Sequence, residues 1–271
     1  MTAQKKPKET PIPVADYCQA FLARLGIETS KKVEFLPERH PQFRECERHG
    51  RYPISRVDEH GTVRYMAPIC PVCAAERASY RLMETAAIPR RYQDCDFSNF
   101  VVEDPAQQAV QESCQDYAEH FGDRLRKGSG LILCGNPGTG KNHLASAITR
   151  TVLSQGRSVL NVTAFEIIAR IRQTWQSRGP KTDLDVIREF AGVDLLIVDE
   201  VGKTFGTDGE RVHLFEVIDY RYREMKPTIV ISNQTLGGIE RYLGAAAFDR
   251  LCHGGHLLVF DWPSHRRGRP E

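Results

Sequence analysis

The chain has 271 residues, of which 41% are hydrophobic, 27% charged and 8% aromatic, and this composition excludes a wholly disordered protein. Its 37 basic and 35 acidic residues leave a net charge of +2, so the charge balance alone predicts neither a nucleic-acid partner nor an acidic one. No apolar run approaches the ~20 residues of a membrane-spanning helix, and the N-terminal lysines precede no apolar stretch like that of a secretory signal. We therefore expect a cytoplasmic protein without membrane contact, with its cysteines reduced.

The first hundred residues show little regular pattern. Residues 1–13 are rich in lysine and proline and predict a disordered arm. Residues 14–26 carry apolar side chains at helical spacing and predict a short amphipathic helix. Residues 31–75 lack a convincing apolar core, and a second helix is predicted over residues 74–87, ahead of Pro89.

Within this region two pairs of metal-ligating residues share the same spacing. Cys46 and His49 form one pair, and Cys70 and Cys73 form the other. Tetrahedral zinc takes four such ligands, commonly as two close pairs, and a segment without a core is where a structural metal stabilises a fold. We predict a structural zinc site; His40 and His60 are alternative ligands that lack the paired spacing.

The second half has the pattern of an α/β domain. Asp104 followed by Pro105 predicts a helix start, with the helix reaching about Phe121. Short apolar runs then alternate with helical patterns, and they have the look of parallel strands buried on both faces. The predicted strands are 131–134, 158–162, 194–198, 228–232 and 256–260.

A glycine-rich loop lies between the first of these strands and a helical run. It comprises Gly135, Asn136, Pro137, Gly138, Thr139, Gly140, Lys141, Asn142 and the adjoining His143. Such a loop directs backbone N–H groups at phosphate oxygens, and its lysine reaches the terminal phosphates of a nucleotide. Asn142 stands where Ser or Thr normally contacts Mg²⁺, and its amide oxygen remains a possible ligand.

Two further strand ends carry polar residues suited to nucleotide hydrolysis. Asp199 and Glu200 follow the strand 194–198; we expect Asp199 to hold Mg²⁺ and Glu200 to orient the attacking water. Asn233 follows the strand 228–232, where its amide can reach the same water or the γ phosphate.

These motifs resemble those of AAA+ ATPases, and among them the DnaC-type bacterial helicase loaders and the IstB-type transposition helper ATPases. The resemblance is carried by GNPGTGKNHLA at 135–145, DLLIVDEVG at 194–202, TIVISNQ at 228–234, FDRL at 248–251 and FDWPSHR at 260–266. It implies that Asn233 is the sensor amide, that Arg250 is an arginine finger acting on a neighbouring subunit, and that Arg266 or Arg267 is a second sensor. Catalysis would then require self-association into a ring or spiral.

Single-stranded DNA is a further expected partner. Arg170, Arg172, Trp175 and Arg178 combine cations with one aromatic ring, as phosphate contact and base stacking require. A solvated basic helix face is the alternative, and the C-terminal arginines 266, 267 and 269 could add a sequence-neutral contact.

The sequence thus predicts a P-loop α/β domain with a parallel sheet over residues 101–271, preceded by a zinc-binding domain over residues 14–100. The resemblance implies that the first of these is an AAA+ domain and that the second is the helicase-docking part. The resemblance implies an ATP-dependent, magnesium-requiring DNA replication protein that places the replicative helicase on DNA, with slow, DNA-stimulated hydrolysis. The alternatives are a transposase partner of the IstB type and a nucleotide-gated adaptor with negligible hydrolysis.

Overall fold

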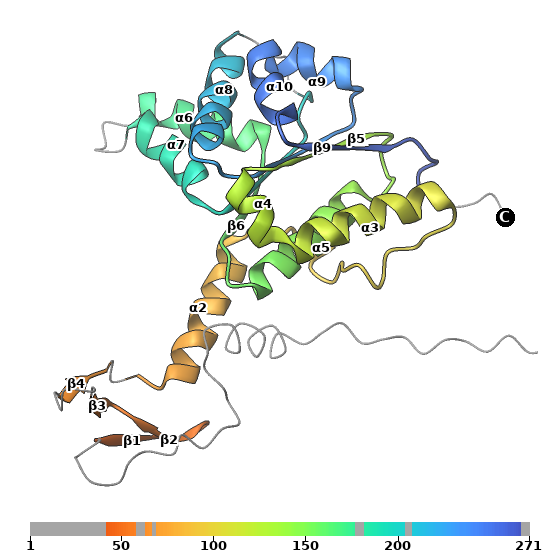
Figure 1. The fold of residues 1–271 in the computed structure, drawn as a ribbon. Coiled ribbons are helices and arrows are strands. Elements are labelled where there is room, and N and C mark those ends of the chain that lie inside the picture. The colour runs from red at the N-terminus through yellow and green to blue at the C-terminus, as the bar shows by residue number, and fades with distance from the viewer. Residues whose placement is uncertain (1–41, 58–62, 67–68, 177–181, 204–207, 267–271) are drawn as a thin grey trace, which may run out of the picture. The chain divides into compact units, whose positions relative to one another are not determined.

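The computed structural model describes residues 42–57, 63–66, 69–176, 182–203 and 208–266 (Figure 1). The predicted arm and the predicted helix 14–26 lie outside these residues. The chain divides into two compact units, residues 1–81 with 154–156, and residues 82–153 with 157–271. In the described residues no helix is both long and apolar enough to cross a membrane.

The first unit contains two short hairpins that the sequence patterns did not predict. Strands β1 (Phe43–Cys46) and β2 (Gly50–Pro53) pair antiparallel, as do β3 (Ser55–Val57) and β4 (Val63–Tyr65). Strands of three or four residues with many polar side chains show no usable alternation. The helix α2 (Pro71–Thr85) follows; it begins three residues before the predicted helix and ends two residues earlier.

The second unit is built on a five-stranded parallel sheet in the order β6-β7-β8-β5-β9. The strands are β5 (Leu131–Gly135), β6 (Val159–Thr163), β7 (Leu195–Asp199), β8 (Thr228–Ser232) and β9 (His256–Phe260). All five lie within one residue of the predicted boundaries. The connection from β5 to β6 crosses to the far edge of the sheet, while β9 pairs with β5 on the other side.

Helices cover both faces of this sheet (Figure 1). One face carries α3 (Pro105–Glu119), α4 (Phe121–Lys127) and α5 (Lys141–Ser154), and the other carries α6 (Ala164–Gln176), α7 (Asp183–Gly192), α8 (Asp208–Arg223), α9 (Leu236–Leu243) and α10 (Ala245–Cys252). The Asp104 carboxylate caps α3 by accepting from the backbone N–H groups of Ala106 and Gln107, as the sequence predicted. The predicted single helix to Phe121 ends at Glu119. His120 separates it from α4, a second helix that begins at Phe121.

Alternate residues of the strands supply two hydrophobic cores. In β5, Leu131 and Leu133 join the core under α3 and α5, whereas Ile132 and Cys134 join the core under α6 to α10. The prediction of burial on both faces is correct for β5, β7 and β8. It is wrong for β9, which is an edge strand with Leu257 and Val259 exposed.

Arg221 of α8 connects several segments at the amino-terminal side of the sheet. Its fully buried guanidinium donates to the carbonyl oxygens of Phe190, Ala191, Val193, Asp194 and Pro227 and to the Thr228 hydroxyl. Burial lowers the pKa of Arg221 to about 9. The side chain therefore joins the end of α7 to the starts of β7 and β8.

Candidate functional site

The carboxyl ends of β5, β7 and β8 meet at one edge of the sheet. In open α/β sheets, ligands bind outside the carboxyl ends of the strands, where the strand order reverses. Here the chain leaves the neighbouring strands β5 and β8 in opposite directions, from β5 to β6 at one edge and from β8 to β9 at the other. The glycine-rich loop begins at the last residue of β5, Asp199 ends β7 and Glu200 follows it, and Asn233 follows β8, so the fold brings the predicted residues together.

The loop after β5 has the backbone conformation that glycine makes possible. Gly135, Gly138 and Gly140 all have positive φ, at 124°, 79° and 95°. A Cβ on Gly138 would lie 2.0 Å from the Ser264 hydroxyl oxygen, and one on Gly135 would lie 2.3 Å from the Phe260 carbonyl oxygen. Gly135 therefore excludes a side chain, whereas at Gly138 the Ser264 side chain would have to move and the positive φ would strain any other residue.

Lys141 begins α5 and is almost fully buried. Its Nζ donates to the carbonyl oxygens of Gly135 at 3.0 Å and Asn136 at 2.5 Å. Burial lowers the pKa of Lys141 to about 8. The side chain is a cation held at the centre of the loop.

Asn142 and the acidic pair lie next to this cation. The Asn142 amide Nδ2 donates to Asp199 Oδ2 at 2.7 Å, and the Glu200 backbone N–H donates to Asp199 Oδ1 at 2.6 Å. Burial raises the pKa of Asp199, and these two hydrogen bonds oppose that shift. Glu200 adopts a φ of 58° and accepts from Lys203 Nζ at 2.6 Å. The sequence analysis did not identify Lys203, because a lysine three residues after an acidic pair is unremarkable in isolation.

These residues line a cavity of about 710 Å³, within the range of small-molecule sites. Predicted site residues make up much of its wall: Pro137, Gly138, Gly140, Lys141, Asn142, His143, Asp199, Glu200, Asn233 and Arg266. Asn136 and Thr139 belong to the same loop; the Thr139 hydroxyl donates to the Asn136 carbonyl at 2.7 Å.

The rest of the wall comes from a segment that no sequence motif marked. It consists of Arg91, Tyr92, Asn99, Phe100 and Val101, with Ile231 and His265 from elsewhere. Phe100 packs edge-on against the His143 ring at 5.3 Å, and His143 Nε2 lies 2.8 Å from the Asp96 carbonyl oxygen. Tyr92 accepts a 3.0 Å hydrogen bond from Arg266. Aromatic residues ahead of a helix cap are common in proteins without a ligand site, so the sequence did not predict that this segment lines the cavity.

The donors of the cavity suit a nucleoside triphosphate and a divalent cation. The positive φ of three glycines lets the loop curl so that its N–H groups can face phosphate oxygens, and Lys141 supplies positive charge for phosphate. The Asp199 carboxylate and the Asn142 amide are oxygen ligands of the kind that Mg²⁺ takes. The residues present therefore fit both groups.

Arg250 lies outside this cavity. Its Nε donates to Asp219 Oδ1 at 2.7 Å, and its guanidinium stacks over Phe215 at 4.9 Å. It lines a separate small cleft together with residues such as Gly130 and Thr228, at the amino-terminal edge of the sheet. Arg250 therefore does not reach the loop of its own subunit.

The predicted nucleic-acid contacts on α6 are largely engaged with protein groups. Arg170 lies over the Phe190 ring at 5.5 Å, and Arg172 Nη2 lies 3.6 Å from Glu210 Oε1. Arg178, Arg267 and Arg269 lie outside the described residues.

Trp175 is the accessible member of this group, with 61% of its surface exposed. Its indole N–H donates to Asp183 Oδ2 at 2.5 Å, and its ring lies 5.3 Å from that of His213. Hydrogen bonds from Thr174 and then Trp175 lower the pKa of Asp183. The ring is thus held in one orientation at the surface.

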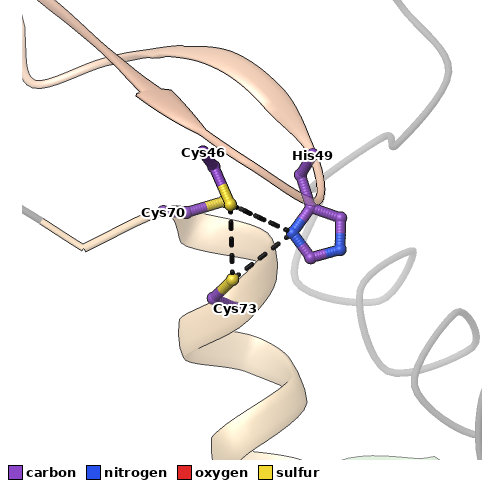
Figure 2. A group of neighbouring side chains, drawn as sticks. All are labelled: Cys46, His49, Cys70 and Cys73. Atoms are coloured by element: carbon purple, nitrogen blue, oxygen red, sulfur yellow. Dashed lines mark hydrogen bonds between the residues drawn. The ribbon is translucent and has the colours of Figure 1, made fainter.

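The cysteine and histidine pairs of the first unit converge, as Figure 2 shows. Cys46 and His49 lie at the turn between β1 and β2, and Cys70 and Cys73 lie at the start of α2. Their ligand atoms all lie within 4.8 Å of one another. His40 and His60 lie outside the described residues.

Four of the six distances among the ligand atoms agree with a tetrahedral zinc site. His49 Nδ1 lies 3.6, 3.7 and 3.3 Å from the sulfurs of Cys46, Cys70 and Cys73, and the Cys46 and Cys73 sulfurs lie 3.6 Å apart. Zinc–sulfur bonds of ~2.3 Å and zinc–nitrogen bonds of ~2.0 Å give tetrahedron edges of about 3.5–3.8 Å. The donor set fits zinc and leaves no position for a substrate.

Comparisons with known proteins identify the family of this chain. The family model of IstB-like ATP binding proteins matches residues 72–269. The protein of Buchnera aphidicola subsp. Acyrthosiphon pisum (strain APS) named "Replicative helicase loader DnaC" is 32% identical over 188 residues, 69% of this chain and 75% of that protein.

Solved structures share the fold. The crystal structure of the DnaC helicase loader matches with a TM-score of 0.57 at 21% identity, over 64% of this chain and 100% of that chain. The replication initiator DnaA bound to AMPPCP and single-stranded DNA matches with a TM-score of 0.55 at 20% identity, over 65% of this chain and 52% of that chain. The fold predicted from the sequence, a P-loop AAA+ domain on a parallel sheet, is confirmed.

Proposed function

Because this chain belongs to the family of IstB-like ATP binding proteins, we propose that it is an ATPase of DNA replication that places the replicative helicase on single-stranded DNA. The observation that carries the proposal is the joint presence of the loop, Lys141, Asp199 and Glu200 around one cavity in a chain 32% identical to a protein named as a replicative helicase loader.

The residues of the cavity divide the work of hydrolysis. The loop N–H groups and Lys141 bind the phosphates of ATP, and Asp199 with Asn142 holds Mg²⁺. When bound, Mg²⁺ neutralises charge that develops on the phosphates. Glu200 orients the attacking water. The Asn233 amide, at the end of the neighbouring strand, donates to this water or to the γ phosphate, and Arg266 contributes a second cation to the cavity.

The place of Arg250 supports the completion of the site by a second subunit. Its guanidinium is remote from the loop of its own chain and sits at the surface, 28% exposed. An arginine of this kind stabilises transferred charge when it enters the site of a neighbour. We therefore include self-association into a ring or spiral in the proposal.

The first unit serves as a zinc-stabilised docking part for the helicase. The Cys46, His49, Cys70 and Cys73 side chains hold one zinc ion, which replaces the apolar core that this segment lacks. All four ligands are protein atoms, so the metal is structural.

Contact with single-stranded DNA is proposed for the α6 surface. An exposed tryptophan ring, held by Asp183 and His213, is suited to stacking on an unpaired base. The DnaA structure of the same fold is described as bound to single-stranded DNA.

The central test uses Glu200→Gln in the full chain. We expect ATP hydrolysis, measured with and without single-stranded DNA, to fall about 100-fold or more, while ATP affinity measured by calorimetry stays within about threefold. Glu224→Gln, an exposed acid at the end of α8, is the matched control and should keep full activity. Absence of ATP binding by the wild type would refute the proposal.

The partner is tested separately by binding experiments with the purified replicative helicase of the source organism. ATP-dependent capture of the helicase by the full chain supports the loader function. Capture of a transposase and no helicase would favour the second candidate, an IstB-type transposition helper, which the name of the matching family model supports.

A nucleotide-gated adaptor is the third candidate. The Lys203–Glu200 and Arg250–Asp219 ion pairs favour it, because each engages a residue needed for hydrolysis. Equal, negligible turnover by the wild type and Glu200→Gln, with ATP binding intact, would establish it.

A further inference from the structure

From the end of β9 the chain returns alongside the glycine-rich loop. We call residues 260–266 the return segment. The Asn136 backbone N–H donates to the Phe260 carbonyl at 2.8 Å, and the Asn136 side chain donates to the Asp261 carbonyl at 2.8 Å. These contacts join residues that are about 125 positions apart in the sequence, and they depend on the pairing of β9 with β5.

Two hydrogen bonds run the other way, from the return segment to carbonyl oxygens of the loop. The Trp262 indole N–H donates to the Thr139 carbonyl at 3.0 Å, and the His265 backbone N–H donates to the Gly138 carbonyl at 2.9 Å. Trp262 is buried and its ring lies 4.9 Å from that of Phe260. The Trp262 hydrogen bond is thus shielded from water.

Because of the geometry of the peptide unit, these hydrogen bonds also fix the directions of neighbouring N–H groups in the loop. In a planar trans peptide the C=O and the next N–H point in opposite directions, and the described residues contain no cis bond. The donor that fixes the Thr139 carbonyl therefore also fixes the Gly140 N–H, which points the opposite way, and Gly140 lines the cavity. The His265 bond does the same for the N–H of Thr139.

We propose that Trp262 is a positioning residue for the phosphates of ATP, acting through the Thr139–Gly140 peptide of the loop. Without the indole donor, this peptide can rotate and the buried Thr139 carbonyl loses its partner. Ordering the loop would then cost part of the free energy of ligand binding. The inference rests on the proposed binding of ATP.

The test compares Trp262→Phe with the wild type in the full chain. Phenylalanine keeps the aromatic packing on Phe260 and removes the N–H donor. We expect the Kd for ATP with Mg²⁺, measured by calorimetry, to rise about tenfold, which is about 1.4 kcal/mol, the scale of one hydrogen bond.

Tyr117→Phe is the matched control for a general loss of stability. Its hydroxyl donates to the Ser129 carbonyl at 2.9 Å, so this variant also loses one buried aromatic donor to a backbone carbonyl. Tyr117 does not line the cavity. We expect its Kd for ATP to match that of the wild type at a temperature where circular dichroism shows all three proteins folded.

A spectroscopic measurement tests the same contact without removing it. The chain has two tryptophans, so Trp175→Phe leaves Trp262 as the only indole emitter. ATP with Mg²⁺ should change its emission, because the ligand acts on the peptide that the indole contacts.

The outcomes separate the inference from the proposed function. A wild type that binds ATP, with an equal Kd for Trp262→Phe or an equal loss in Tyr117→Phe, overturns the inference and leaves the function standing. An unchanged Trp262 emission at saturating ATP also overturns it. A wild type that binds no ATP overturns both.

Discussion

At the scale of single residues, burial decides the charge of the loop lysine. Lys141 is almost fully enclosed and its ammonium is held by loop carbonyls. Burial lowers its pKa to about 8, so the free protein carries the cation below pH 8 and loses it above. Bound phosphate favours the charged form and raises this pKa.

This shift predicts the pH dependence of ATP affinity. Below pH 8 the protonation of Lys141 should not change the Kd for ATP. Above pH 8 the free protein must take up a proton on binding, so the Kd should rise by up to about tenfold per pH unit. Calorimetry between pH 7 and 9.5 measures the slope. Lys141→Met should bind weakly with no such slope; a wild-type Kd independent of pH would contradict the assignment.

Arg221 illustrates a charge used for structure. Its guanidinium has six hydrogen-bond contacts and is fully buried. We expect Arg221→Met to lower the free energy of unfolding by about 2–4 kcal/mol, because buried carbonyl groups lose their donors.

The control for Arg221 lies two residues along the same helix. Arg223 is 65% exposed and pairs with Asp219, so Arg223→Met should change the free energy of unfolding by less than about 0.5 kcal/mol. Urea unfolding followed by circular dichroism compares the two. Similar losses in both variants would show that Arg221 has no special role.

At the scale of elements, the β1–β2 turn and the start of α2 carry the four proposed zinc ligands, which lie together (Figure 2). Strands of four residues and an isolated helix turn are marginal alone. The proposed zinc ion would give them a common anchor, because the binding energy of the metal is also folding energy.

Removal of one ligand should therefore remove the metal. We expect about one zinc per wild-type chain and almost none in Cys70→Ser, measured by elemental analysis, together with faster proteolysis around residues 42–76. Cys252→Ser, at an exposed cysteine outside the cluster, should keep its zinc. Wild-type protein purified without chelators and free of zinc would contradict the prediction.

At the scale of the whole molecule, the proposed role of Arg250 requires a second chain. Arg250 is paired with Asp219 and does not line the cavity that holds Lys141 and Glu200. Hydrolysis that needs both must therefore use two subunits.

Mixing two inactive variants tests this requirement. Arg250→Ala keeps an intact loop, and Glu200→Gln keeps an intact Arg250; each alone should hydrolyse ATP at least about 100-fold more slowly than the wild type. Their mixture should recover activity at sites where the two meet. Arg241→Ala, at an exposed position of α9, is the control. Full activity of Arg250→Ala alone, or no recovery on mixing, would rule out the shared site.

The sequence by itself determined those features that a local pattern encodes. The bounds of β8 and β9, the Asp104 cap of α3 and the glycine-rich loop could all be predicted from short stretches, because periodicity, capping and φ preference act between near neighbours. The paired spacing of the cysteines and histidine likewise indicated a shared site.

Only the tertiary structure decided which distant segments meet. The β1 to β4 hairpins are too short to show alternation, and β9 is exposed because the strand order puts it at an edge. Tyr92 and Phe100 enter the cavity, and Trp262 reaches Thr139, through long-range packing. A sequence pattern cannot predict such contacts. The order of strands in the sheet places these residues side by side, and no local preference encodes that order.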